Sequence, residues 1–148
     1  MKARIVYASM TGNDADMAEI LEEDLLDYDF EVETSEAEFT DASDYLTCDL
    51  CVFVTYTYGE GKMTDDIADF YEQLAELDLH DKHFAVMGSG DQTYADHFCE
   101  NVFDFEKMFK QVGATQVTKP VTIENEPDET SIAAIDAAAK EMAEKLNA

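Results

Sequence analysis

Positive charge is scarce in this sequence. Its 148 residues include 9 Lys and Arg against 35 Asp and Glu, so the formal net charge is −26 at pH 7. Nucleic acid and anionic membrane surfaces would repel such a chain, which argues against both as partners. A basic protein partner is favoured instead, because opposite charges speed encounter. A surface that only confers solubility is the simpler alternative.

Long apolar runs are absent as well. No run approaches the ~18 residues that a membrane span needs. Lys2 and Arg4 lead straight into a short apolar segment, without the apolar stretch of a signal peptide. We therefore expect a cytoplasmic protein. A hydrophobic content of 46% is enough for one core, and the length suits a single domain over 1–148.

Cysteine is rare, and its odd count of three argues against a disulfide framework. Cys48 and Cys51 form a C-x-x-C motif, but the surrounding "DLCVFVTY" predicts a buried strand. Side chains three residues apart on a strand point to opposite faces. No second pair completes a zinc site. We expect structural cysteines and no metal.

Apolar strand patterns alternate with helical patterns along the whole chain. Strands are predicted at 3–8, 30–37, 49–56, 83–90 and 115–123, with helices between and after them. The helical faces comprise Met17, Ala18, Leu21 and Leu25; Ile67, Phe70, Tyr71 and Leu74; Phe98, Val102, Phe105, Phe109 and Val112; and Ile132, Ile135, Ala139, Met142 and Leu146. This alternation predicts an α/β fold, a doubly wound parallel sheet with helices on both faces.

Polar loops follow the first, third and fourth strands, where ligands bind in such sheets. The loops are "SMTGND", "TYTYGEG" and "GSGDQTY". In the first loop, Ser9, Thr11 and Asn13 precede a helix whose free N–H groups attract phosphate. Ordinary helix capping is the alternative interpretation.

Nucleotide motifs of other classes are missing, because neither G-x-x-x-x-G-K-[ST] nor G-x-G-x-x-G occurs. Tyr56, Tyr58 and Tyr94 could instead sandwich a planar ring between the second and third loops. The alternative is that these tyrosines merely cover the end of the sheet.

The three loops, in this order, resemble those of the short-chain flavodoxins. The resemblance rests on "SMTGN", "TYGE" and "GDQTY…FC" and extends over the whole chain. It implies five strands in the order 2-1-3-4-5 and FMN at the switch point, flavodoxin being a standard example of that rule.

The resemblance also implies which residues hold noncovalent FMN. They are Ser9, Met10, Thr11, Gly12, Asn13 and Asp14 in the first loop; Thr55, Tyr56, Thr57, Tyr58, Gly59 and Glu60 in the second; and Ser89, Gly90, Asp91, Tyr94, Phe98 and Cys99 in the third. The first group would surround the phosphate, although Asp14 stands where the family usually has Thr.

Roles within the other two loops follow from the same resemblance. Tyr58, or alternatively Tyr56, would stack on the inner face of the flavin and Tyr94 on the outer face. The Gly59–Glu60 peptide would accept a hydrogen bond from flavin N5–H. Residues along the pyrimidine edge would be Gly90, Asp91 and Cys99.

The implied function is low-potential, one-electron transfer between reductases and redox enzymes by a monomeric carrier, not an enzyme. Basic flavodoxin reductases and oxidoreductases are the implied partners. One alternative is a specialised flavodoxin-like redox partner or a quinone reductase. A signalling receiver domain is a more distant one, since "TKPV" at 118–121 resembles its Lys-Pro.

Overall fold

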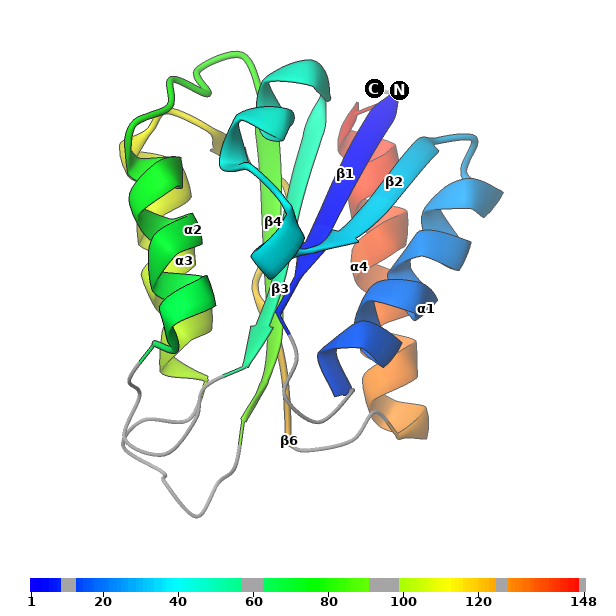
Figure 1. Ribbon diagram of the computed structural model, residues 1–148. Helices are drawn as coiled ribbons and strands as arrows, with labels where there is room; N and C mark the ends of the chain where they lie inside the picture. The colour runs from blue at the N-terminus through cyan, green and yellow to red at the C-terminus, as the bar shows by residue number, and fades with distance from the viewer. Residues whose placement is uncertain (9–12, 57–62, 91–98, 125–127, 147–148) are drawn as a thin grey trace.

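The computed structural model describes residues 1–8, 13–56, 63–90, 99–124 and 128–146 (Figure 1). Its elements run in the order β1 (Lys2–Tyr7), α1 (Asn13–Asp27), β2 (Glu31–Glu36), the 3-10 helices η1 (Ala37–Phe39) and η2 (Ala42–Thr47), β3 (Leu50–Tyr56), α2 (Asp65–Ala75), β4 (His83–Gly90), α3 (Glu100–Gln111), β5 (Thr115–Gln116), β6 (Val121–Glu124) and α4 (Glu129–Leu146).

The sheet is parallel, and β1 pairs with both β2 and β3. β4 continues from β3, so the strand order is β2-β1-β3-β4-β5, as predicted. The chain therefore passes from β1 to β2 at one edge of the sheet and then crosses back to β3 on the other side of β1. This reversal places a switch point between β1 and β3.

The predicted fifth strand, 115–123, is divided into two short strands on the same side of β4. Thr115–Gln116 pairs with His83–Phe84, and β6 pairs with Met87–Gly90. Between these pairings β4 advances three residues while the outer segment advances five. The surplus lies beside Pro120, which lacks the N–H that a ladder requires. The interruption therefore has a local chemical cause.

Two helices cover each face of the sheet, with α1 and α4 on one side and α2 and α3 on the other (Figure 1). The predicted apolar positions of α1 are all buried, and the described faces of α2 and α3 agree with the prediction except that Tyr71 is half-buried. In α4 the prediction fails at Ile132, which is 38% exposed in the first turn. Phe98 lies outside the described residues.

β2 is an edge strand, as its alternating polar pattern predicts. Arg4 of β1 bonds to Glu33 across the pair and donates to Ser35 Oγ at 2.9 Å. The same guanidinium lies 3.3 Å from Asp44 in η2. One cation therefore ties the edge strand and η2 to the central sheet.

The C-x-x-C motif departs from the expected geometry. Cys48 is not on the strand but caps the carboxyl end of η2, while Cys51 is in β3. Their Sγ atoms are therefore only 3.8 Å apart instead of on opposite faces. Both residues are buried, and among the described residues no cluster of His, Cys, Asp or Glu could hold a metal ion.

No helix in the described ranges is both long and apolar enough to cross a membrane.

Gly88 permits α3 to approach β4 closely. A Cβ at this position would lie 2.3 Å from the carbonyl oxygen of Thr55 and 2.3 Å from Val102 Cγ2. Real Cβ atoms do not tolerate such contacts, and the Thr55 carbonyl belongs to the backbone of a central strand. Glycine is therefore required here by the space between two strands and a helix.

We expect Gly88→Ala to lower the free energy of unfolding by about 1–3 kcal/mol, because the added methyl overpacks a rigid region. The measurement is urea unfolding of the apoprotein, followed by circular dichroism. The midpoint should fall while the slope stays constant. An unchanged midpoint would show that β3 and α3 can move apart without cost.

Candidate functional site

The carboxyl ends of three adjacent strands define the candidate site. β1 ends at Tyr7, β3 at Tyr56 and β4 at Gly90, and the ends of β3 and β4 pair directly through Tyr56 and Ser89. The segments 57–62 and 91–98 follow β3 and β4 directly, and the segment 9–12 follows β1 after Ala8. The topology thus brings the starts of all three polar loops to one edge of the sheet.

Most predicted site residues lie outside the described part of the chain. These are Ser9, Met10, Thr11, Gly12, Thr57, Tyr58, Gly59, Glu60, Asp91, Tyr94 and Phe98. Asn13 is placed as the first residue of α1. The structure brings together the remaining six: Asp14, Thr55, Tyr56, Ser89, Gly90 and Cys99.

Asp14, in the first turn of α1, is the most unusual of the six. It is 1% exposed and accepts a hydrogen bond from the Ser89 hydroxyl at 2.7 Å, which joins α1 to the end of β4. Its second oxygen, Oδ2, has no hydrogen-bond partner among the described residues. A buried carboxylate with an unpaired oxygen is costly, so protonation is favoured.

Burial raises the pKa of Asp14 to about 7, although the hydrogen bonds from Ser89 oppose the shift. At neutral pH the side chain is therefore poised between carboxylate and carboxylic acid. The acid form carries an O–H that can donate to a phosphate oxygen, whereas the carboxylate would repel it. The residue thus fits a phosphate group when it is protonated.

The end of β3 is held by hydrogen bonds to a single carbonyl. Tyr56 O accepts from Thr55 Oγ1 at 3.3 Å and from Asn101 Nδ2 at 3.0 Å. Asn101 is fully buried in α3. Sequence analysis missed this residue, although an amide beside an apolar helix face could have signalled a buried polar contact.

The Tyr56 side chain is engaged in contacts with the protein and is not free to stack on a ligand ring. It packs partly buried against the core cluster under α2 and α3. Its hydroxyl lies 3.0 Å from Thr64 Oγ1 at the N-cap of α2. Thr64, also missed from the sequence, in turn bonds to Asp66. The hydroxyl of Tyr56 therefore anchors the start of α2.

Cys99 is buried at the N-cap of α3, with its Sγ 3.9 Å from the carbonyl oxygens of Gly88 and Ile123. Burial, and secondarily the charge of Asp14, raises the pKa of its thiol to about 12. It is therefore a neutral thiol at physiological pH. Such a group packs beside a ligand but does not act as a nucleophile.

Carboxylates stand in the first turn of each long helix. They are Asp14 and Asp16 in α1, Asp65 and Asp66 in α2, Glu100 in α3 and Glu129 in α4. Each interacts favourably with the positive end of its helix dipole. Because helices that follow parallel strands begin at the carboxyl edge of the sheet, these acids also surround the candidate site with negative charge.

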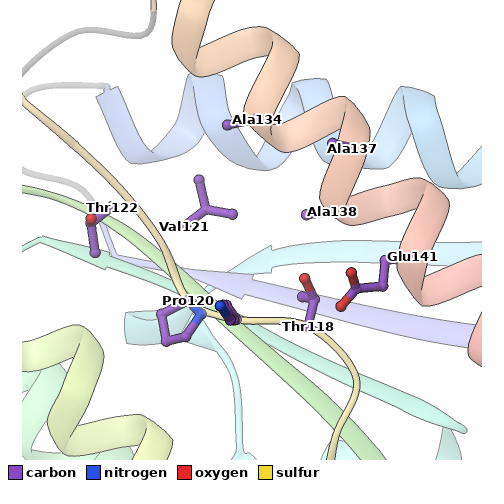
Figure 2. A pocket seen from close by; sticks show the side chains of 9 residues that line it. Thr118, Pro120, Val121, Thr122, Ala134, Ala137, Ala138 and Glu141 are labelled. Carbon is purple, nitrogen blue, oxygen red and sulfur yellow. The ribbon is translucent and has the colours of Figure 1, made fainter.

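A shallow groove of about 420 Å³ lies elsewhere, between the β5–β6 connection and α4 (Figure 2). Alanines of α4 line one side, and Thr118, Pro120 and Val121 line the other (Figure 2). It lies beside the helix rather than at the carboxyl ends of the strands. Strand topology, not groove size, therefore places the candidate site.

Comparisons with known proteins identify the family of the chain. The Flavodoxin family model matches residues 5–146. The chain is 38% identical over 128 residues to probable flavodoxin 2 of Bacillus subtilis (strain 168), covering 86% of this chain and 84% of that protein.

Two solved structures are similar over nearly the whole chain. The flavodoxin of Streptococcus pneumoniae TIGR4 matches with a TM-score of 0.95 and 41% identity, over 98% of this chain and 99% of that one. A short-chain flavodoxin associated with a PDU bacterial microcompartment matches with a TM-score of 0.95 and 36% identity, over 98% of both chains.

The chain therefore belongs to the flavodoxin family. Flavodoxins are FMN-dependent electron carriers, and this chain is an electron carrier of that class rather than an enzyme. The predicted family, fold and cofactor are confirmed. The receiver-domain and quinone-reductase alternatives are not favoured.

We expect Asp14→Asn to stabilise the apoprotein at pH 8 and to have little effect near pH 4. Because the folded-state pKa of about 7 exceeds the ordinary 3.8, the folded wild type binds more protons between these values. Its stability contribution is present at low pH and is lost as the pH rises through 7. The measurement is the free energy of unfolding across pH 4–8.

Asp16→Asn is the matched control, since Asp16 is an exposed acid in the same helical turn. This substitution should slightly weaken the interaction with the dipole of α1. It should not change the shape of the plot of unfolding free energy against pH between 5 and 8. Identical profiles for the two variants would contradict the role given to burial of Asp14.

Proposed function

We propose that residues 1–148 form a low-potential, one-electron carrier that binds one FMN noncovalently at the carboxyl edge of β1, β3 and β4. The observation that supports this most directly is the adjacency of these three strand ends, each followed by one of the polar loops. Loops that are far apart in the sequence would thereby contact the phosphate, the ring and the ring edge of the same ligand.

The phosphate end of FMN is proposed to lie at the start of α1. Ser9, Thr11, Gly12 and Asn13 would supply donors, aided by the helix dipole. Asp14 would act as a further donor while protonated, held in place by Ser89. No cationic side chain is needed, which agrees with the lack of Lys and Arg in the first loop.

The flavin ring is proposed to stack between Tyr58 and Tyr94. Tyr56 is the weaker candidate because its ring packs on the core and its hydroxyl is engaged with Thr64. Asn101 would hold the Tyr56 carbonyl, so that the second loop starts from a fixed point. The Gly59–Glu60 peptide, Gly90, Asp91 and Cys99 keep the roles that the resemblance implies.

Bound FMN supplies the redox chemistry, since it takes up electrons one at a time and is anionic when fully reduced. The chain's own contribution is electrostatic. Acids such as Asp16, Asp65 and Asp66 in the first helical turns would oppose further negative charge at this edge. A single carboxylate ~12 Å from an added charge costs ~0.7 kcal/mol at an effective dielectric of ~40, before salt screening.

A basic oxidoreductase is proposed as the partner. An acidic groove of about 290 Å³ between η1 and α2 includes Glu38, Asp65 and Asp69 among its lining residues. Phe39, next to Glu38, is 79% exposed and could pack against an apolar site at the centre of a contact. Opposite charge around such a contact would speed docking.

The carrier is proposed to be a cytoplasmic monomer. Its exposed large apolar side chains are scattered over several elements, among them Leu26 in α1, Phe39 in η1 and Phe103 in α3. The strong net negative charge opposes self-association. The three cysteines are free thiols, as is usual in a reducing compartment.

The direct test is flavin content. We expect the purified protein to be yellow and to release one FMN per chain when it is denatured. Titration of the apoprotein with FMN should restore the colour at one equivalent, while riboflavin should bind more weakly because it lacks the phosphate. A colourless protein that binds neither flavin would overturn the proposal.

We expect the triple variant Asp16→Asn, Asp65→Asn, Asp66→Asn to raise the potential of the second electron by ~50 mV. Three carboxylates contribute ~2 kcal/mol before screening, or ~85 mV, because ~1.4 kcal/mol corresponds to ~59 mV for one electron. Screening by salt lowers the expected shift to ~50 mV. The measurement is a spectroscopic redox titration at low and moderate salt.

The matched control is Glu72→Gln, Glu76→Gln, Glu144→Gln, which removes three exposed charges at the opposite ends of α2 and α4. Its potential should stay near that of the wild type. Equal shifts in both triple variants would mean that net charge, not its location, sets the potential.

A further inference from the structure

Two of the three cysteines form a close pair at the amino end of β3. Cys48 Sγ and Cys51 Sγ are 3.8 Å apart. Cys48 Sγ also lies 3.4 Å from the carbonyl oxygen of Tyr45 and 3.3 Å from that of Leu50. A disulfide needs sulfur atoms about 2.05 Å apart, so a shift of roughly 1.8 Å would join them.

Cys48 can make this shift more readily than a residue within the ladder. It lies at the end of η2, outside the strand, whereas Cys51 pairs with Arg4 and Phe84 in the sheet. The two residues therefore combine one sulfur on a fixed strand with one on a short connection. This is the arrangement in which a C-x-x-C motif closes a disulfide with least change in the sheet.

Charges of both signs surround Cys48. Lys2, Arg4 and Glu33 line the same surface depression as Cys48, and Arg4 is paired with Glu33 and Asp44. The hydrogen bond from Cys51 is the main cause that lowers the pKa of Cys48, and the same bond raises that of Cys51. The charge of Lys82 also lowers the pKa of the Cys48 thiol, and that of Asp49 opposes it. Cys48 is thus the thiol that ionises first.

The small size of the depression disfavours large oxidants. Its volume is about 10 Å³, close to the minimum for one water molecule. Hydrogen peroxide, with two oxygen atoms, is only modestly larger than water, whereas a peptide disulfide is far larger. Cys48 is 4% exposed and Cys51 is fully buried, so an oxidant meets Cys48 first.

We propose that Cys48 and Cys51 are a peroxide-sensitive thiol pair that closes to a reversible disulfide. The Cys48 thiolate attacks hydrogen peroxide, gains one oxygen to become a sulfenic acid, and releases hydroxide. The Cys51 sulfur then displaces that oxygen as water and forms the S–S bond. In total, two thiols and one peroxide give one disulfide and two waters.

This site is independent of the flavin site. Cys51 is the second residue of β3 and Tyr56 is its last, so about 17 Å of extended strand separates the pair from the carboxyl edge. Cys99, at that edge, is buried with a raised thiol pKa and serves as an internal reference. The outcome for the pair does not depend on which ligand occupies the carboxyl edge.

The test is thiol counting on the full-length, FMN-loaded protein. Reduced protein is freed of reductant, treated with hydrogen peroxide at a dose that oxidises free cysteine in the same buffer, then denatured and alkylated. We expect three alkylated cysteines before treatment and one afterwards. Dithiothreitol should restore all three.

Peptide mapping identifies the bond. Cleavage before aspartate separates Cys48 from Cys51 at Asp49 and yields peptides 44–48 and 49–64. After peroxide treatment these two peptides should remain joined until they are reduced. Cys99→Ser should still lose two thiols, whereas Cys48→Ser should keep Cys51 alkylatable.

Cys51→Ser gives a second readout, because it leaves Cys48 without a resolving thiol. A sulfenic acid at Cys48 should then be captured by dimedone. Circular dichroism and the flavin spectrum verify that each variant is folded. Three alkylatable thiols in the treated wild type, a sulfinic acid at Cys48 without a cross-link, or a bond to Cys99 would each overturn the proposal.

Discussion

The pairing of β1 with strands on both of its sides is the constraint on which the rest of the molecule depends. Because β2 and β3 flank the same strand, the β1–β2 and β2–β3 crossovers run in opposite directions and must cover opposite faces of the sheet. The helices then form two layers, and the strand ends on either side of the switch point come together. The site is therefore a consequence of strand order, and the residues that follow each strand only specify which ligand it accepts.

Negative charge serves two purposes in this arrangement. An acid in the first turn of a helix stabilises that helix through its dipole. Since every long helix begins at the same edge of the sheet, the same acids would create a negative field around the proposed flavin site. Asp14 is the exception, because its burial favours the neutral acid, which would relieve repulsion at the proposed phosphate end.

Strand order, the helix layers and most core residues could be predicted from the sequence, because apolar periodicity reports them directly. The interruption of the last strand at Pro120 was not predicted. A proline in an apolar run does not show how many of its neighbours lose their backbone hydrogen bonds to the adjacent strand. Ile132 was misplaced because helical periodicity does not show how far a helix extends past its neighbours.

Side-chain contacts of the site were harder to predict than its location. Asn101 reaches a carbonyl 45 residues away in the chain, and Ser89 reaches Asp14 across 75 residues. Neither contact leaves a local pattern in the sequence. Cys48 and Cys51 were predicted to point apart because strand geometry was applied to both, although the predicted strand covered only residues 49–56. In the structure Cys48 ends η2 and the strand begins at Leu50. Treating one residue before the strand as part of it was enough to reverse the inferred relation between two sulfur atoms.

The edge strand β2 has a consequence for behaviour at high concentration. Its unpaired side could serve as a template for a strand from another molecule. Glu31, Glu33 and Glu36 lie along this short strand, and Arg4 holds Glu33 in place from within the sheet. A second copy approaching in the same way would bring carboxylates against carboxylates. The exposed edge is thereby protected against intermolecular β-pairing and the aggregation that follows from it.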